Sequence, residues 1–274
     1  MGAFDWTVEA YFGKKLGPDA TAPTATPDSA DLAAPAVAVA QADVRGPADA
    51  RSPGQVFVAY DLETTGLYPD KDRIVEIGAV KFDRRGIIGR FSTLIDPGIP
   101  MPSDTTRING ITDGMLQGMP TLDEVLPDFL RFIQNAVLIA HNANFDGSFV
   151  NAALKLRWDW ARKQKKEDAS QGSLLDSLGE TNPSEAKGAQ GSAVPQTGSP
   201  PLWWAPPFAL LPNRVVDTLI FSKEAFPGLP KYKMQDLAMF LKIQALEAHR
   251  AEDDARVCME LFIKCAERTF QKLS

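Results

Sequence analysis

Apolar residues fill both faces of two short runs in this chain, a pattern typical of strands buried in the middle of a sheet. One run leads into Asp61 and Glu63, and the other lies at 136–140. Three further strands are predicted from runs bounded by turn residues. The predicted strands cover residues 57–63, 73–82, 87–95, 136–140 and 214–217. The first three follow one another closely, which predicts a meander.

Helical spacing of apolar residues predicts helices between and after the later strands. The first of them begins with Thr121 and Glu124, which have the spacing of a capping box. The predicted helices cover residues 121–133, 144–158, 217–224, 235–241 and 252–272. Because a three-strand meander precedes alternating helices and strands, the expected fold is α/β, with a mixed β-sheet flanked by α-helices.

Composition divides the chain into one globular domain and two segments that lack its pattern. The predicted domain covers residues 54–274 and is interrupted by a flexible insertion at about 159–212. Residues 1–53 form an arm whose second part is rich in Ala, Pro, Thr and Asp, and this part cannot bury enough apolar surface to become ordered. The first 16 residues are aromatic-rich. Three alternatives are open for them: docking on a partner, folding back on their own domain, or remaining a disordered end.

The overall charge argues against one mode of nucleic-acid binding. The formal net charge is -6 and the isoelectric point is about 5.1, so the chain lacks the basic surface of a protein that grips a duplex by charge alone. A nucleic-acid role must therefore rest on a local site or on a partner. Cys258 and Cys265 fit no disulfide or metal pattern, and no apolar run approaches the roughly 18 residues of a membrane span. We expect a cytoplasmic protein with reduced thiols.

The candidate chemistry begins at the end of the first strand. Side chains alternate along a strand, so Asp61 and Glu63 point to the same face. Two carboxylates at the end of an apolar strand are costly unless a positive charge neutralises them, and a divalent metal ion is the usual one. The Thr64, Thr65 and Gly66 that follow end the strand and let the backbone approach a ligand closely.

Two later segments each combine a histidine with carboxylates, and they contain both histidines of the chain. His141 directly follows the fourth strand and places Asp146 in the first turn of a helix, at the strand end where α/β sheets bind ligands. His249 precedes a helix that opens with the acidic residues 252–254. Four converging carboxylates predict a two-metal site for a phosphate. His249 can supply the base that takes a proton from the attacking water.

Together these motifs resemble those of the DEDDh 3′-5′ exonucleases, the DnaQ-like branch of the ribonuclease H-like superfamily. They are Asp-x-Glu-Thr-Thr-Gly at 61–66, His-Asn-x-x-Phe-Asp at 141–146 and His-x-Ala-x-x-Asp at 249–254. The similarity runs from about residue 55 to 270 and is greatest to proofreading exonucleases of the epsilon-subunit and PolC types. It implies a ribonuclease H-like fold. Arg250 stands where a sister class has tyrosine, which indicates the histidine type.

The resemblance also implies a role for each motif residue. His249 is implied to be the general base. The implied ligands of two Mg²⁺ or Mn²⁺ ions, all four of them catalytic, are Asp61, Glu63, Asp146 and Asp254. The implied contacts to the terminal nucleotide are Thr64, Thr65, Gly66 and Leu67, with His141 and Asn142 flanking the same pocket. These assignments are predictions that follow from the resemblance alone.

The expected function is the release of mononucleotides from the 3′ end of single-stranded DNA, in polymerase proofreading or repair. Binding one frayed end needs stacking and metal ions rather than a broad basic face. Two alternatives are open: an exoribonuclease of the oligoribonuclease or ribonuclease T type, and a subunit that mainly tethers a polymerase. The arm and the 159–212 insertion are the candidate docking segments for a DNA polymerase or sliding clamp. Within the insertion, residues 171–175 loosely resemble a clamp-binding peptide.

Overall fold

The computed structural model describes residues 3–13, 55–177, 206, 208–246 and 249–273. The chain divides into two compact units, one formed by residues 1–149 and 212–274 and the other by residues 150–211. The first unit contains the whole sheet and every residue that the sequence predicts to act in the site.

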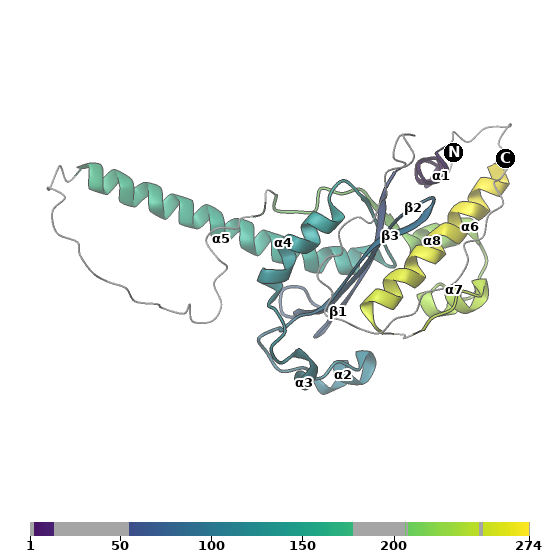
Figure 1. Cartoon of the computed structure of the whole chain (residues 1–274), viewed down its shortest axis with the longest axis horizontal. Coiled ribbons are helices and arrows are strands. Elements are labelled where there is room, and N and C mark those ends of the chain that lie inside the picture. Colours follow the sequence, from purple (N-terminus) through teal and green to yellow (C-terminus); the bar gives the residue numbers. More distant parts are fainter. Residues whose placement is uncertain (1–2, 14–54, 178–205, 207, 247–248, 274) are drawn as a thin grey trace. The chain divides into compact units, whose positions relative to one another are not determined.

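A five-stranded sheet forms the centre of the first unit, in the order β3-β2-β1-β4-β5 (Figure 1). Its strands are β1 (Phe57–Thr64), β2 (Ile74–Asp83), β3 (Gly86–Leu94), β4 (Val137–Ala140) and β5 (Val215–Asp217). Neighbours among β1, β2 and β3 pair antiparallel, whereas β4 pairs parallel with both β1 and β5. The predicted α/β fold, with an antiparallel meander joined to parallel strands, is therefore confirmed.

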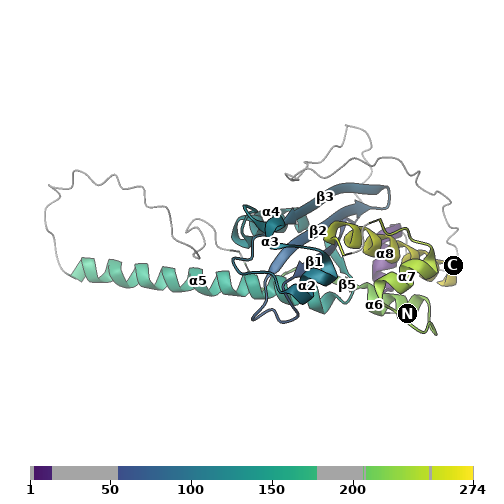
Figure 2. The ribbon, with the colours of Figure 1, turned by 90° about the horizontal axis from the view of Figure 1, so that it is seen from below.

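Helices connect the strands and cover the sheet. α4 (Leu122–Ile133) begins at the predicted capping box, in which both hydrogen bonds are formed. The helices after β4 are α5 (Ala143–Ser177), α6 (Thr218–Ala225), α7 (Met234–Leu241) and α8 (Ala251–Leu273). α8 lies along one face of the sheet against β1 and β2, as Figure 1 and Figure 2 both show. Its Phe262 packs on Phe57 and Phe82 in the core.

Two parts of the fold differ from the sequence prediction. The connection after β3 contains α2 (Ser103–Asn109) and α3 (Asp113–Leu116), which are too short for an apolar period to be recognised. α5 is predicted to end near residue 158 but continues to Ser177, because residues 159–171 contain neither Gly nor Pro to stop it. The remainder of the predicted insertion, up to residue 205, lies outside the described residues.

Helix α1 (Asp5–Phe12) folds back on the first unit, which is one of the three alternatives that the sequence leaves open for the aromatic end of the arm. Its Tyr11 ring meets Phe262 edge-on at a centroid distance of 5.6 Å. The Arg214 guanidinium lies 3.4 Å from the centre of the Trp6 ring, in the position of a cation–π contact. The start of the arm is thus a part of the hydrophobic core.

Cys258 and Cys265 are buried free thiols on α8, as expected for reduced cysteines in a core. Burial raises the pKa of the Cys265 thiol to about 12, so this group stays protonated. Within the described residues, no helix has the length and apolar character needed to cross a membrane.

Candidate active site

Asp61 and Glu63 come from the carboxyl end of β1 and share one face of the sheet, as the alternation of side chains along a strand predicts. Across the antiparallel pair, Asp61 lies opposite Gly78 and Glu63 opposite Glu76 on β2. The register shifts between Glu63 and Thr64, where β1 ends. β1 therefore delivers two carboxylates to one end of the sheet.

Asp146 reaches the same end of the sheet from the first turn of α5. β4 runs parallel to β1, so the carboxyl ends of the two strands are neighbours. A carboxylate oxygen of Asp146 accepts the backbone N–H of Leu62 at 3.1 Å. Asp217 holds the turn before α5 by accepting the backbone N–H groups of Asn142 and Ala143, each at 3.1 Å. These bonds place the Asp146 carboxylate against β1.

The third motif lies where α8 begins. Asp254, in the first turn of the helix, accepts the backbone N–H of His249 at 3.1 Å. His249 has a backbone φ of 67°, in the left-handed region that residues other than Gly rarely adopt. One ligand atom from each of Glu63, His249 and Asp254 can be chosen so that all three lie within 4.8 Å of one another. The fold thus joins the β1 carboxylates to the α8 motif.

A buried carboxylate holds the start of α8 against β2. Glu76 accepts hydrogen bonds from the Arg250 guanidinium at 2.9 Å and from the Ala251 backbone N–H at 3.2 Å. Beside it, Gly78 leaves space for the helix, because a Cβ at this position would lie 2.0 Å from the carbonyl carbon of Ala251. Arg250 and Ala251 directly follow His249, so these contacts set the position of the third motif.

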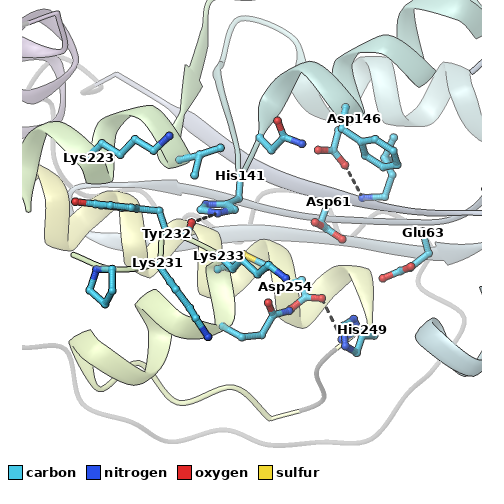
Figure 3. A pocket seen from close by; sticks show the side chains of 17 residues that line it. Asp61, Glu63, His141, Asp146, Lys223, Lys231, Tyr232, Lys233, His249 and Asp254 are labelled. Atoms are coloured by element: carbon cyan, nitrogen blue, oxygen red, sulfur yellow. Dashed lines mark hydrogen bonds between the residues drawn. The ribbon is translucent and has the colours of Figure 1, made fainter. Parts of the chain in front are cut away.

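A pocket of about 700 Å³ opens at this end of the sheet (Figure 3). Its lining includes all five predicted catalytic residues, namely Asp61, Glu63, Asp146, His249 and Asp254. His141 and Asn142 line it as well. The His141 ring bonds through Nδ1 to the Thr218 hydroxyl at 3.0 Å and through Nε2 to the Tyr232 carbonyl oxygen at 2.9 Å. Because both ring nitrogens are engaged, His141 supports the wall of the pocket.

The other predicted substrate contacts, at 64–67, form the turn that leaves β1 and are not among the residues lining the pocket. Thr65 is buried, and its hydroxyl accepts the backbone N–H of Arg73 at 2.9 Å. The Thr64 hydroxyl donates to the Gly66 carbonyl oxygen. Leu67 is 71% exposed. The turn therefore presents an apolar side chain to solvent four residues beyond Glu63.

Sequence reasoning missed one part of the pocket lining. The missed residues are Lys223, Lys231, Tyr232 and Lys233, from α6 and its connection to α7. Single lysines in a connection resemble ordinary surface residues, and the only available signal was the Lys-Tyr-Lys run at 231–233.

Burial and mutual repulsion raise the pKa values of all four carboxyl groups, with burial as the largest cause. The pKa of Asp61 lies well above its usual range because the group is buried and because Asp146 and Asp254 face it. The pKa values of Glu63, Asp146 and Asp254 rise to about 7, 8 and 6. The negative charges thus destabilise one another, and a bound cation would relieve the repulsion.

The donor set fits divalent metal ions. Carboxylate oxygens are the ligands that Mg²⁺ and Mn²⁺ prefer, and a carboxylate oxygen of Glu63 lies within 4.8 Å of one of Asp254. The raised pKa values support the same conclusion. Carboxylates that repel one another bind protons more readily, and a divalent metal ion would relieve the same repulsion in place of those protons.

We expect a divalent metal to stabilise the protein more strongly as the pH rises. In metal-free protein, a carboxyl group with a raised pKa costs no stability below its unfolded pKa of about 4, and the cost grows until the pH exceeds its folded pKa. For Glu63, Asp146 and Asp254 that window extends to between about 6 and 8. The increase in melting temperature from EDTA to Mg²⁺ should therefore be larger at about pH 8 than at about pH 5. An equal increase at both pH values would contradict this account.

A mixed sheet that gathers four carboxylates and a histidine in one pocket is typical of metal-dependent phosphodiester hydrolases. A comparison with known proteins agrees, because the family model described as Exonuclease matches residues 58–166 and 206–262. The chain belongs to this exonuclease family, whose members depend on divalent metal ions. Residues 167–205, which the family model leaves unmatched, fall within the predicted insertion.

Several similar curated proteins are named as DNA polymerase III proteins. The chain is 43% identical over 208 residues to DNA polymerase III subunit epsilon of Treponema pallidum, covering 75% of this chain and 74% of the relative. It is 36% identical over 225 residues to DNA polymerase III PolC-type of Caldanaerobacter subterraneus, covering 82% of this chain but only 12% of that longer relative. The 3′-5′ exonuclease class and the resemblance to the epsilon-subunit and PolC types are confirmed.

Solved exonuclease structures share the fold. Exonuclease I of E. coli in complex with a dT13 oligonucleotide superimposes with a TM-score of 0.52 at 16% identity, covering 80% of this chain and 43% of that chain. Exonuclease I of Methylocaldum szegediense gives a TM-score of 0.51 at 16% identity, with 80% and 41% covered. At these identities the likeness concerns the fold alone.

Proposed function

We propose that this enzyme releases mononucleotides from the 3′ end of single-stranded DNA and that it proofreads for a replicative DNA polymerase. The observation that carries the proposal is the convergence of four carboxylates and His249 on one pocket. The relatives named as DNA polymerase III subunits favour DNA over RNA and a polymerase as the partner. A role limited to tethering would not require an intact set of five catalytic side chains.

The proposed metal ligands are Asp61, Glu63, Asp146 and Asp254, and the proposed ions are two Mg²⁺ or Mn²⁺. When bound, such ions supply activation of the attacking water and charge stabilisation at the leaving oxygen. The protein positions the carboxylates for this task from three separate elements, β1, α5 and α8.

His249 is the proposed general base. In the described part of the chain its ring takes part in no hydrogen bond, while its backbone N–H is tied to Asp254. Imidazole is the side chain that enzymes use most often as a general base. The backbone anchor fixes the loop and leaves a ring nitrogen available to receive the proton of the attacking water.

The terminal nucleotide is proposed to occupy the turn at 64–67. Backbone groups of this turn would meet the 3′ hydroxyl, and the exposed Leu67 would pack against the terminal base. Burying that leucine against a base would release apolar surface from water and so favour binding. His141 and Asn142 would bound the same space from the pocket wall.

We also propose that residues 54–274 form the catalytic domain and that the insertion at about 159–212 is one of its docking segments for the polymerase or clamp. The family model skips residues 167–205, so this stretch is free to carry a function outside catalysis. Because helix α1 contributes to the core, the insertion is the better candidate of the two docking segments.

The decisive test is an exonuclease assay on 5′-labelled single-stranded DNA and RNA oligonucleotides of one sequence. In Mg²⁺ the DNA should shorten in steps of one nucleotide, and EDTA should abolish the reaction. His249→Gln, which removes the base and keeps a polar side chain of similar size, should lower kcat by about 10² to 10⁴-fold.

The matched control is Lys264→Gln, because it introduces the same residue on α8 at a position that does not line the pocket. It should retain far more activity than His249→Gln. A faster reaction on RNA than on DNA would identify an exoribonuclease instead, and no shortening of either substrate would leave the tethering alternative.

A further inference from the structure

Three lysines line the catalytic pocket together with the carboxylates. They are Lys223, Lys231 and Lys233. All three are exposed, and within the described residues none of them forms an ion pair with a carboxylate. In a chain with a formal charge of -6, a group of lysines without neutralising partners beside a substrate pocket is an unusual concentration of positive charge.

The segment that carries two of these lysines is firmly held. The Tyr232 hydroxyl donates to the Phe226 carbonyl oxygen at 2.7 Å and accepts the Leu229 backbone N–H at 3.0 Å. At the other end of the same residue, the carbonyl oxygen of Tyr232 bonds to His141 at 2.9 Å. These contacts hold Tyr232 through both its side chain and its backbone. The backbone that carries its neighbours Lys231 and Lys233 therefore has a defined position.

The lysines lie on the side of the pocket that is away from Glu63 and His249. In Figure 3 the three lysines lie to the left of Asp61, whereas Glu63 and His249 lie to its right. If the terminal nucleotide occupies the turn beyond Glu63, the rest of the strand must leave the pocket in another direction. The side that carries the lysines offers the charge that its phosphates require.

We propose that Lys231 and Lys233, with Lys223 beside them, bind the backbone phosphates of the nucleotides that precede the terminal one. This inference rests on the proposed function, since it assumes that the scissile phosphate sits among the carboxylates. The lysines would not take part in the chemical step. They would hold a strand of at least two or three nucleotides, so that an acidic protein can retain single-stranded DNA without a broad basic face.

The test compares substrates that contain or lack these upstream phosphates. A nitrophenyl ester of thymidine monophosphate has only the scissile phosphate, whereas an oligothymidylate of about eight nucleotides has upstream phosphates as well. Lys231→Gln/Lys233→Gln should cleave the ester as wild type does. On the oligonucleotide its KM should rise by about 10 to 100-fold with kcat unchanged, because two charged contacts are lost.

Salt dependence supplies a second readout that a purely structural role would not change. For single strands, each phosphate contact contributes about 0.7 to the slope of log binding against log salt. The slope of log kcat/KM should therefore become shallower by about 1.4 in the double variant. Lys242→Gln/Lys264→Gln is the matched control, because it removes the same charge from residues that do not line the pocket.

Each remaining outcome is decisive. If the double variant cleaves the ester normally and keeps the KM of the wild type for the oligonucleotide, the lysine site is rejected and the proposed function stands. An equal rise of KM in the control pair would also reject the site, since net charge would then explain the effect.

A loss of ester cleavage would show that the lysines act at the terminal nucleotide. If the wild type cleaves neither substrate, the proposed function fails, and this inference fails with it.

Discussion

Asp61→Asn should abolish most of the activity and, in the absence of metal, make the protein more stable. The asparagine keeps the shape of the side chain but removes the negative charge that a metal ion would meet. The contribution of a catalytic metal is worth several kcal/mol, so kcat should fall by about 10³-fold or more. The same change removes one charge from a buried group that faces Asp146 and Asp254.

The gain in stability has a definite dependence on pH. The pKa of Asp61 is raised well above its usual range, so its ionisation costs nothing below its unfolded pKa of about 4 and costs more as the pH rises. In EDTA, the melting temperature of Asp61→Asn should therefore exceed that of the wild type at about pH 8 and match it at about pH 4. In saturating Mg²⁺ the wild type should have the higher melting temperature, because metal binding stabilises it more than it stabilises Asp61→Asn. A variant that is inactive and less stable in EDTA at every pH would contradict this explanation.

Gly78→Ala should damage both the fold and the site, although residue 78 does not line the pocket. A Cβ at this position would lie 2.0 Å from the Ala251 carbonyl carbon and 2.1 Å from the Glu252 backbone nitrogen. Backbone atoms cannot rotate away as side chains do, so the start of α8 must shift. Overpacking typically costs about 1 to 3 kcal/mol, and a backbone overlap belongs at the upper end or beyond. For a domain of this size, about 3 kcal/mol lowers the melting temperature by about 6 to 12 °C.

The loss of activity should exceed what the loss of stability explains. At a temperature where Gly78→Ala is fully folded, kcat should still be reduced, because the shift of α8 separates His249 and Asp254 from the carboxylates of β1. Gly89→Ala on β3 is the control, since the nearest atom to its Cβ would be in the Phe132 side chain, at 3.3 Å, and no backbone atom is among its three nearest neighbours. It should change stability by less than about 1 kcal/mol. Equal effects of the two substitutions would show that the contact at Gly78 is unimportant.

Much of this site could be predicted because it depends on local rules. Alternation along a strand places Asp61 and Glu63 on one face. The parallel pairing of β1 with β4 then brings Asp146 to the same end of the sheet. Both rules act within single elements or between neighbouring strands, so a pattern in the sequence is sufficient to apply them.

The parts that sequence reasoning missed depend on contacts between distant segments. Glu76 appears in the sequence as one acid in an apolar strand, and only the fold shows that it binds Arg250 and Ala251. Likewise, the carbonyl of Tyr232 meets His141 only because the connection between α6 and α7 returns to the end of β4. The length of α5 was missed for another reason, because the chain beyond residue 158 has helix-forming residues but no apolar period.

Helix α1 binds the domain as an intramolecular ligand, because it belongs to the same chain. It packs by Tyr11 and Trp6 into the core, and residues 14–54 alone connect it to the domain. While that connection is intact, the effective concentration of the helix near its site is high and independent of dilution. A protease site engineered into residues 14–54 would turn this intramolecular contact into a bimolecular one. The cut protein would then lose α1 on dilution and expose Phe262 and its aromatic neighbours to other chains.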